Sequence, residues 1–355
     1  MMKIVFQGSE YQLDTLDDLR QRYPEASKLL DFIQDWQQGK PSYEFQTSGS
    51  TSSPKVIDVN REQIVASARA TGQFLELKKS DQVLCCLDPQ FVASLMMAAR
   101  CLIWNMDLAL EKPSANPMTA IKNQIDFASF VPFQVYQMIA DNNLHQLENI
   151  RNVLIGGAPL TPAAFGTLAQ LNTNIYATYG MTETVSHIAL MPVKGKYSQA
   201  YYHLLPNIVI GQDDEQCLKV SGAVTNHNTL QTNDIVEITG RTFRWLGRRD
   251  HVINSGGIKI HPEQLERKIA NLLSSDFFIS WQANEKLGNE CILITKGAPM
   301  AIEKLEEIQK VVTEAFSKHH APKRAVNVDT FEHTASGKIK REETRIKALK
   351  LGQLG

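Results

Sequence analysis

The nine residues from Thr47 to Lys55 bring together hydroxyl groups, a glycine and one cation. Successive backbone N–H groups in such a loop, with the hydroxyls and the Lys55 ammonium, can surround a chain of phosphates. The stretch lacks the G-x-x-x-x-G-K-[ST] spacing of the common phosphate loop, and a serine-rich surface turn is the alternative interpretation. The residues expected to contact phosphate are Thr47, Ser48, Gly49, Ser50, Thr51 and Lys55.

Further segments later in the chain also carry groups that can do chemistry. Glu183 is a hard oxygen ligand suited to Mg²⁺, and the neighbouring Thr182 hydroxyl can donate to a phosphate. The segments are Gly156-Gly157-Ala158-Pro159-Leu160, Tyr179-Gly180-Met181-Thr182-Glu183, Gly247-Arg248-Arg249-Asp250 with Ser255-Gly256-Gly257, and Ser336-Gly337-Lys338-Ile339.

In this order, and together with the hydroxyl loop, these segments resemble the adenylate-forming superfamily of acyl- and aryl-CoA ligases, firefly luciferase and carrier-loading adenylation domains. The stretch YGMTETVSHIAL and the SGG segment resemble the o-succinylbenzoate–CoA ligases within it. The resemblance implies an enzyme that uses ATP, Mg²⁺ and CoA to convert a carboxylic acid into an acyl-AMP and then a thioester. The expected acid is o-succinylbenzoate.

The resemblance also implies roles in nucleotide binding. Tyr179 offers a flat face for stacking on adenine, and the glycine turn lets backbone approach the opposite face. Asp234 can accept hydrogen bonds from the ribose hydroxyls, with Arg248 as a ribose or phosphate partner. The implied ATP or AMP contacts beyond the hydroxyl loop are Gly156, Gly157, Ala158, Tyr179, Gly180, Met181, Thr182, Asp234 and Arg248, with Glu183 as the metal ligand.

The catalytic lysine of the family falls on Lys338. A carboxylate must attack an anionic α-phosphate, so a cation is needed where charge accumulates; Thr182 and Glu183 complete the implied catalytic set. Asp250 matches the hinge about which the family's end domain swings. Ser255, Gly256 and Gly257 are implied to approach CoA, although a tight turn with positive φ is an equally good interpretation of this segment.

The acyl pocket is expected to involve Phe91, Ser186 and His187, although a lone histidine is more often structural. Family members usually carry far more chain before the hydroxyl loop than the 46 residues found here. A second copy of the chain can supply the missing cover, which makes a homodimer one expected assembly. Ser52 also departs from the glycine that is common in the family.

Helix-like and strand-like segments alternate along the first two thirds of the chain, which predicts an α/β layered fold. We expect strands near 3–6, 82–87, 127–131 and 152–155, and helices at 16–33, 62–74, 92–104 and after Thr161. Short alternating segments after Gln212 predict a small antiparallel sheet. The remainder predicts a small, mobile α+β domain with helices at 262–272 and 301–319, strands at 277–282 and 291–295, and a basic tail after Pro322. The expected domains are residues 1–248 and 249–355.

The 355 residues carry 37 basic and 38 acidic side chains, which disfavours a nucleic-acid partner. Five cysteines without a C-x-x-C pair indicate a reducing compartment, and no apolar run of about 20 residues could span a bilayer. The expected location is the cytoplasm. Two alternatives stay open: an adenylation enzyme that loads a carrier-protein phosphopantetheine, and a nucleotide-binding protein without turnover.

Overall fold

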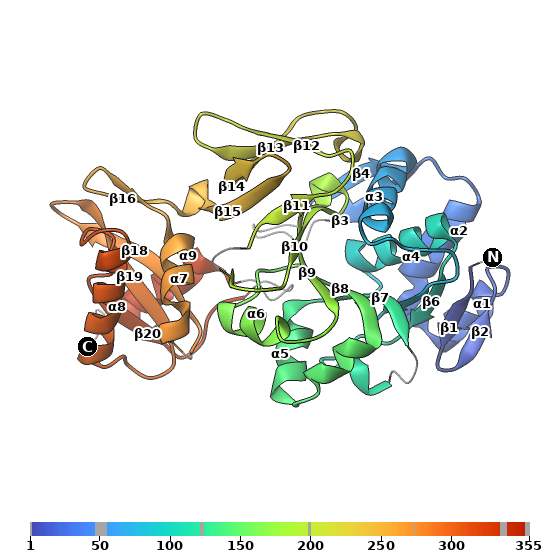
Figure 1. Cartoon of the computed structure of the whole chain (residues 1–355), viewed down its shortest axis with the longest axis horizontal. Helices are drawn as coiled ribbons and strands as arrows, with labels where there is room; N and C mark the ends of the chain where they lie inside the picture. Colours follow the sequence, from blue (N-terminus) through green and yellow to red (C-terminus); the bar gives the residue numbers. More distant parts are fainter. Residues whose placement is uncertain are drawn as a thin grey trace.

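A thirteen-stranded sheet dominates the computed structural model, which describes residues 2–46, 55–120, 124–197, 200–273, 275–333 and 339–351 (Figure 1). The strand order is β12-β13-β14-β15-β11-β10-β9-β8-β7-β5-β6-β1-β2. The strands are β1 Ile4–Phe6, β2 Ser9–Tyr11, β5 Gln82–Cys85, β6 Asp107–Leu110, β7 Ile125–Phe130, β8 Ile150–Ile155, β9 Asn174–Gly180, β10 His187–Pro192, β11 Tyr202–Leu204, β12 Val209–Gln212, β13 Cys217–Ser221, β14 Leu230–Thr239 and β15 Thr242–Arg248.

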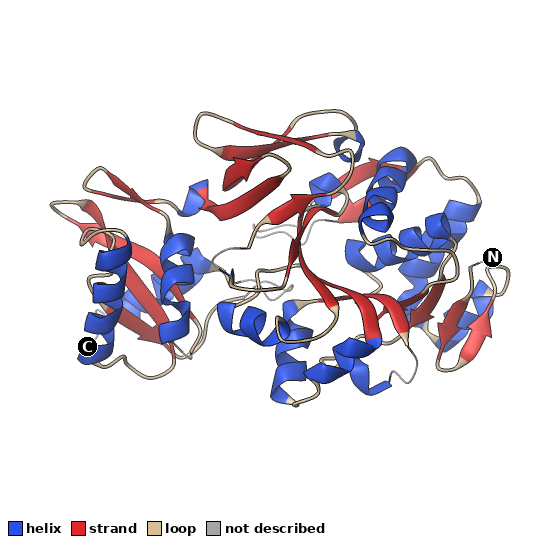
Figure 2. Ribbon diagram, in the orientation of Figure 1, coloured by secondary structure: helices blue, strands red, loops and turns tan. Residues whose placement is uncertain are grey.

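The adjacent strands β9, β8, β7, β5, β6 and β1 run parallel to one another. Helices cover both faces of this part of the sheet (Figure 2). Alternate residues explain the two faces: Phe127 packs in one buried cluster, whereas Ala128 and Phe130 pack in the other. The helices are α3 Arg61–Phe74, α4 Val92–Trp104, α5 Pro132–Ala140 and α6 Pro162–Leu168. Asn60 caps α3 and Thr161 caps α6 by accepting backbone N–H groups, as their residue types favour. The expected α/β layering is therefore confirmed.

The start of the chain differs from the single helix expected over 16–33. Pro24 cannot donate a backbone N–H, so the segment divides into α1 Leu16–Arg22, η1 Pro24–Ala26 and α2 Ser27–Gln37. A separate antiparallel pair, β3 Ser42–Gln46 and β4 Val56–Asn60, flanks residues 47–54. Further short helices are η2 Pro117–Ala120, η3 Leu144–Asn149, η4 Thr182–Thr184 and η6 Ala223–Thr225.

The strands after Gln212 do not form a small sheet of their own. They continue the main sheet, because β15 pairs with β11 and β11 pairs with β10. Local alternation predicts a strand but not its distant partner, so the sequence could not distinguish these two arrangements.

A second sheet is built from residues after Arg249, where η7 Arg249–His251 follows β15. Its order is β17-β16-β19-β18, with β20 parallel to β19. The elements are β16 Ile253–Ser255, β17 Ile258–Ile260, α7 Pro262–Ile269, η8 Ala270–Leu272, β18 Phe277–Asn284, β19 Gly288–Lys296, α8 Ile302–Ala315, β20 Ala325–Val328 and α9 Arg341–Leu351. The segment after Pro322 is thus not a simple basic tail: β20 and α9 bury Val326, Val328 and Ala348.

Among the described residues, two buried apolar clusters contain side chains of the main sheet, and two others contain side chains of the second sheet. Within the described ranges, no helix is long and apolar enough to cross a membrane. All five cysteines are free and buried.

Candidate active site

The candidate site lies where loops leave the carboxyl ends of the parallel strands. β5, β7, β8 and β9 point the same way, so the segments that follow them meet at one edge of the sheet. Ligands of open α/β sheets bind at such edges. Gly156 donates its N–H to the Phe130 carbonyl at 3.0 Å, and Gly157 adopts φ +94°, close to Val131. The glycine turn predicted to approach adenine therefore lies at this edge, as does Phe91 before α4.

The segment from Gly180 to His187 is tightly constrained. A Cβ at Gly180 would lie 2.4 Å from the Ser186 carbonyl oxygen and from the His187 Cα, so only glycine fits. Val185 has φ +67° and ψ −49°, and the Ser186 N–H donates to the Thr184 carbonyl at 2.7 Å across it. This is a γ-turn, which is rare and strained at a β-branched residue. The turn fixes Thr182 and Glu183 between β9 and β10.

Asp234 on β14 accepts hydrogen bonds from side chains of β9 and β15. The Tyr179 hydroxyl donates to its Oδ2 at 2.7 Å, and the Trp245 indole N–H donates to its Oδ1 at 2.9 Å. Burial and the Asp234 charge raise the pKa of Tyr179, so its hydroxyl keeps its proton and remains a donor. The Tyr179 ring meets Phe243 and Tyr202 edge-on and stays partly exposed. Each Asp234 oxygen retains a lone pair for a further donor.

Arg248 links the ribose candidate to the hinge candidate. Its guanidinium lies 3.8 Å from the Asp234 carboxylate and binds Asp250 through two nitrogens at 2.9 and 3.0 Å. Burial by itself raises the pKa of Asp250. The hydrogen bonds and the charge of Arg248 have the larger combined effect, so the pKa of Asp250 is lowered. The structure thus brings Tyr179, Asp234, Arg248 and Asp250 into one connected group.

Glu183 is exposed in the short helix η4. Among the residues that the structure describes, no cluster of three His, Cys, Asp or Glu side chains could hold a metal ion. Mg²⁺ commonly binds through one or two carboxylates together with substrate phosphates and waters, so a single exposed carboxylate fits that ion.

The acyl-pocket candidates Ser186 and His187 lie in a buried polar cluster. The His187 Nε2 is 2.9 Å from the Thr71 Oγ1 of α3, and its Nδ1 is 3.4 Å from the Ser186 Oγ. Burial, with a smaller effect of the Arg100 charge, holds the pKa of His187 well below its usual value. His187 is therefore neutral at physiological pH.

Arg100 is a candidate that the sequence did not reveal. It lies on α4 with 2 % of its surface exposed and donates to the Ser186 Oγ at 3.1 Å. Its Nε has no hydrogen-bond partner among the described residues, and no carboxylate there affects its pKa. Burial lowers the pKa of Arg100 to about 10, which still leaves the side chain charged. The one signal in the sequence was a charge inside the least polar stretch of the chain.

The remaining candidates divide into three groups. Phe91 is 44 % exposed, and Lys55 precedes β4. Ser255 is buried at the end of β16, and Gly256 and Gly257 form its tight turn to β17 with φ of +55° and +82°. This confirms the turn, while contact with CoA stays a prediction. The candidates Thr47, Ser48, Gly49, Ser50, Thr51 and Lys338 lie outside the described residues.

The fold and this site define an AMP-binding enzyme. The model of the AMP-binding enzyme family matches residues 6–221, and the chain belongs to that family. This confirms the resemblance that the ordered segments indicated.

Curated relatives and solved structures agree with this assignment. The chain is 24 % identical over 340 residues to 2-succinylbenzoate–CoA ligase of Listeria monocytogenes, covering 90 % of this chain and 72 % of that protein. It is 36 % identical to an acyl-CoA synthetase (AMP-forming)/AMP-acid ligase II-like protein of Dyadobacter fermentans, with TM-score 0.63, covering 92 % and 95 % of the two chains. The o-succinylbenzoate CoA synthetase of Bacillus subtilis, in complex with the acyl-adenylate intermediate, has the same fold, with 20 % identity, TM-score 0.71 and coverage of 84 % and 68 %.

Proposed function

We propose that this protein is a cytoplasmic acid–CoA ligase that forms an acyl-AMP from ATP and then an acyl-CoA thioester, with o-succinylbenzoate as its acid. We also propose that residues 1–248 hold ATP and the acid, and that residues 249–355 form a second, mobile domain. The name of the Listeria relative and the family model support the reaction class.

The nucleotide roles follow from the connected group around Asp234. The free lone pairs of its carboxylate accept the ribose hydroxyls, while Tyr179 and Trp245 hold it in place. Thr182 donates to the α-phosphate, and the hydroxyl loop of residues 47–51 with Lys55 binds the outer phosphates. Glu183 would hold Mg²⁺, which supplies positive charge to the phosphates when bound.

The observation that carries the choice of acid is the buried, carboxylate-free guanidinium of Arg100. A buried charge is costly unless it is paired, so an anionic group of a ligand would stabilise Arg100. o-Succinylbenzoate has two carboxylates, of which one attacks the α-phosphate and the other remains available to Arg100. Ser186, which accepts a hydrogen bond from Arg100, would lie beside that second carboxylate.

Lys338 has the catalytic role in the first step of this mechanism. Its ammonium neutralises charge as the attacking carboxylate oxygen forms a bond to the α-phosphorus and the bond to pyrophosphate breaks. Rotation at Asp250 then removes Lys338 and lets the CoA thiol attack the acyl carbon, with AMP as the leaving group.

The test is acid-dependent release of pyrophosphate. We expect release with o-succinylbenzoate to exceed release with benzoate, which has no second carboxylate, and Arg100→Gln to remove this preference. Lys338→Ala should slow acyl-AMP formation by about two to three decades and leave thioester formation from synthetic acyl-AMP largely intact. Equal loss in both half-reactions would remove Lys338 from this role.

Two further measurements address the acceptor and the assembly. Thioester formation with free CoA, compared with a carrier protein, separates the ligase from a carrier-loading adenylation enzyme. ATP binding without acid-dependent pyrophosphate release would indicate a binding protein. Sedimentation velocity tests the homodimer that we propose.

A further inference from the structure

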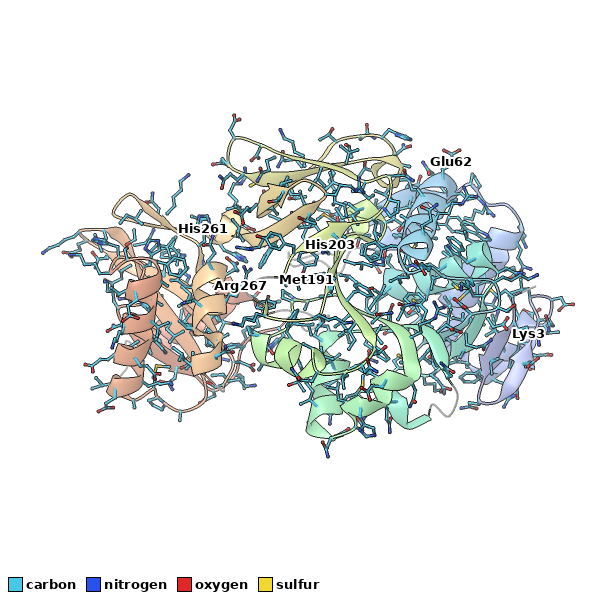
Figure 3. All side chains as sticks on the ribbon, viewed as in Figure 1. Lys3, Glu62, Met191, His203, His261 and Arg267 are labelled. Carbon is cyan, nitrogen blue, oxygen red and sulfur yellow. The ribbon has the colours of Figure 1, made fainter. Side chains whose placement is uncertain are left out.

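One face of α7 packs on β15, the strand that pairs with the Asp234 strand β14. Glu263 and Arg267 are four residues apart in α7 and therefore share this face. Figure 3 labels Arg267 on α7, and Met191 on β10 in the neighbouring main sheet. The side chains of these two α7 residues reach across from the second sheet to the first.

Arg267 makes two contacts with residues of the first part of the chain. Its Nη2 donates to the Trp245 carbonyl at 2.7 Å, and its guanidinium carbon lies 5.6 Å from the centre of the Tyr197 ring. The same Trp245 donates its indole N–H to Asp234. A bulge between Ile235 and Val236 shifts the β14–β15 register beside this tryptophan. Trp245 thus contacts Asp234 through its side chain and α7 through its backbone.

Glu263 makes the second half of the contact. Its carboxylate is 6 % exposed and approaches Gly247 so closely that a Cβ there would lie 2.5 Å from Oε2. Its Oε1 bonds to the Nδ1 of His251 in η7, at the proposed hinge. Arg341, three residues after Lys338, lies 3.8 Å from the same oxygen. Glu263 therefore contacts β15, the hinge and the segment that follows the catalytic lysine.

We propose that Arg267 and Glu263 are positioning residues that dock α7 on β15 and stabilise this one orientation of residues 249–355. The docking contact comprises these two side chains with Trp245 and Gly247. The docking contact itself does not depend on the proposed function, and only its expected effect on the reaction rests on that function. Because the two half-reactions need different orientations, weakening the contact alters their relative rates, and Trp245 connects the contact to the ribose carboxylate.

The orientation can be measured without turnover. Arg69 on α3 and Lys310 on α8 are exposed, and the five native cysteines are buried, so Arg69→Cys and Lys310→Cys accept spin labels selectively. We expect Arg267→Ala to broaden or shift the distance distribution between the two labels. Lys268→Ala, which removes the same charge from an exposed position of the same helix, should leave it unchanged. Arg267→Lys, which keeps the positive charge and N–H donors, should restore part of the wild-type distribution.

The second readout is the ratio of the rates of acyl-AMP formation and of thioester formation from synthetic acyl-AMP. We expect Arg267→Ala to change this ratio by about tenfold or more, because a hydrogen bond from a charged group commonly contributes at least that factor. Glu263→Gln should change it in the same direction. An unchanged distance distribution in Arg267→Ala overturns the proposal whatever acid the enzyme uses. Equal slowing of both half-reactions overturns it as well, because it indicates a merely structural role.

Discussion

His187 and Arg100 lie in the same buried cluster, and burial changes the charge of one but not of the other. The ordinary pKa of a histidine lies near 6.5, so burial is sufficient to keep His187 neutral at pH 7. The ordinary pKa of an arginine is so high that a fall to about 10 leaves Arg100 charged. The cluster therefore holds one buried cation beside a neutral hydrogen-bonding ring, which is suited to binding a single carboxylate.

The neutral state of His187 predicts a pH dependence of stability. Its folded pKa lies below its unfolded pKa, so as the pH falls below about 6.5 the unfolded chain binds a proton that the folded chain does not. The free energy of unfolding should therefore fall by up to about 1.4 kcal/mol per pH unit from this residue. Urea unfolding at pH 7.5, 6.5 and 5.5 measures the slope. His187→Gln should have a shallower slope, and an unchanged slope would show that protonation of His187 does not contribute.

At the scale of elements, α9 and α7 are joined by Arg341. Its guanidinium donates to both oxygens of Glu266 at 2.7 Å and lies 5.5 Å from the centre of the Phe278 ring. Burial by itself lowers the pKa of Arg341, but the carboxylates of Glu266 and Glu263 have the larger effect and raise it. The pairing of His333 with Ile339 and the Lys340 N–H bond to the Glu332 carbonyl lie at the base of the segment that carries Lys338. Arg341 anchors this base to α7.

Removing this anchor should destabilise the second sheet and its helices. Arg341→Ala removes the cation beside two largely buried carboxylates and leaves Glu263 with His251 and Glu266 with the Ile279 N–H. The loss should cost about 2 kcal/mol, below the range for fully buried pairs because the Arg341 side chain is partly exposed. Lys350→Ala, at an exposed position of the same helix, should change stability by less than about 0.5 kcal/mol. Urea unfolding compares the two variants. Similar values for both would show that the Arg341 pairs contribute little.

Local patterns were sufficient to predict many of these elements. The apolar run of α4 gave its bounds, 92–104, and Thr161-Pro162 gave the start of α6. The pairing of β11 with β15 was not predictable, because it joins residues about forty positions apart through backbone bonds that no side-chain pattern specifies. At the candidate site, the sequence singled out Tyr179, Asp234 and Arg248, which the structure brings together, while their contacts with a nucleotide stay a prediction. Arg100, Trp245 and Glu263 were missed because their importance comes from burial and from partners distant in the chain.

For the whole molecule, the arrangement of the cores distinguishes two parts. Among the described residues, no buried apolar cluster contains members from both sides of Arg249. The contacts across this position that α7 makes with described residues are one hydrogen bond, one ring contact and the close approach of Glu263 to Gly247. Polar contacts of this kind contribute little cooperativity compared with a shared core.

This separation predicts two transitions in calorimetric unfolding, of which ATP with Mg²⁺ raises only the one that belongs to residues 1–248. Ligand at about 100 times its Kd stabilises the part that binds it by about 2.7 kcal/mol. The proposed role of Glu183 as the Mg²⁺ ligand predicts that EDTA reduces the shift and that Glu183→Gln reduces it without EDTA. The transition of residues 249–355 should stay in place throughout. A single transition of the whole chain that moved with ATP would contradict this separation. The docking contact would then have to couple the two parts far more strongly than its one hydrogen bond and ring contact allow. The proposed rotation at Asp250 would have to break that coupling in every turnover.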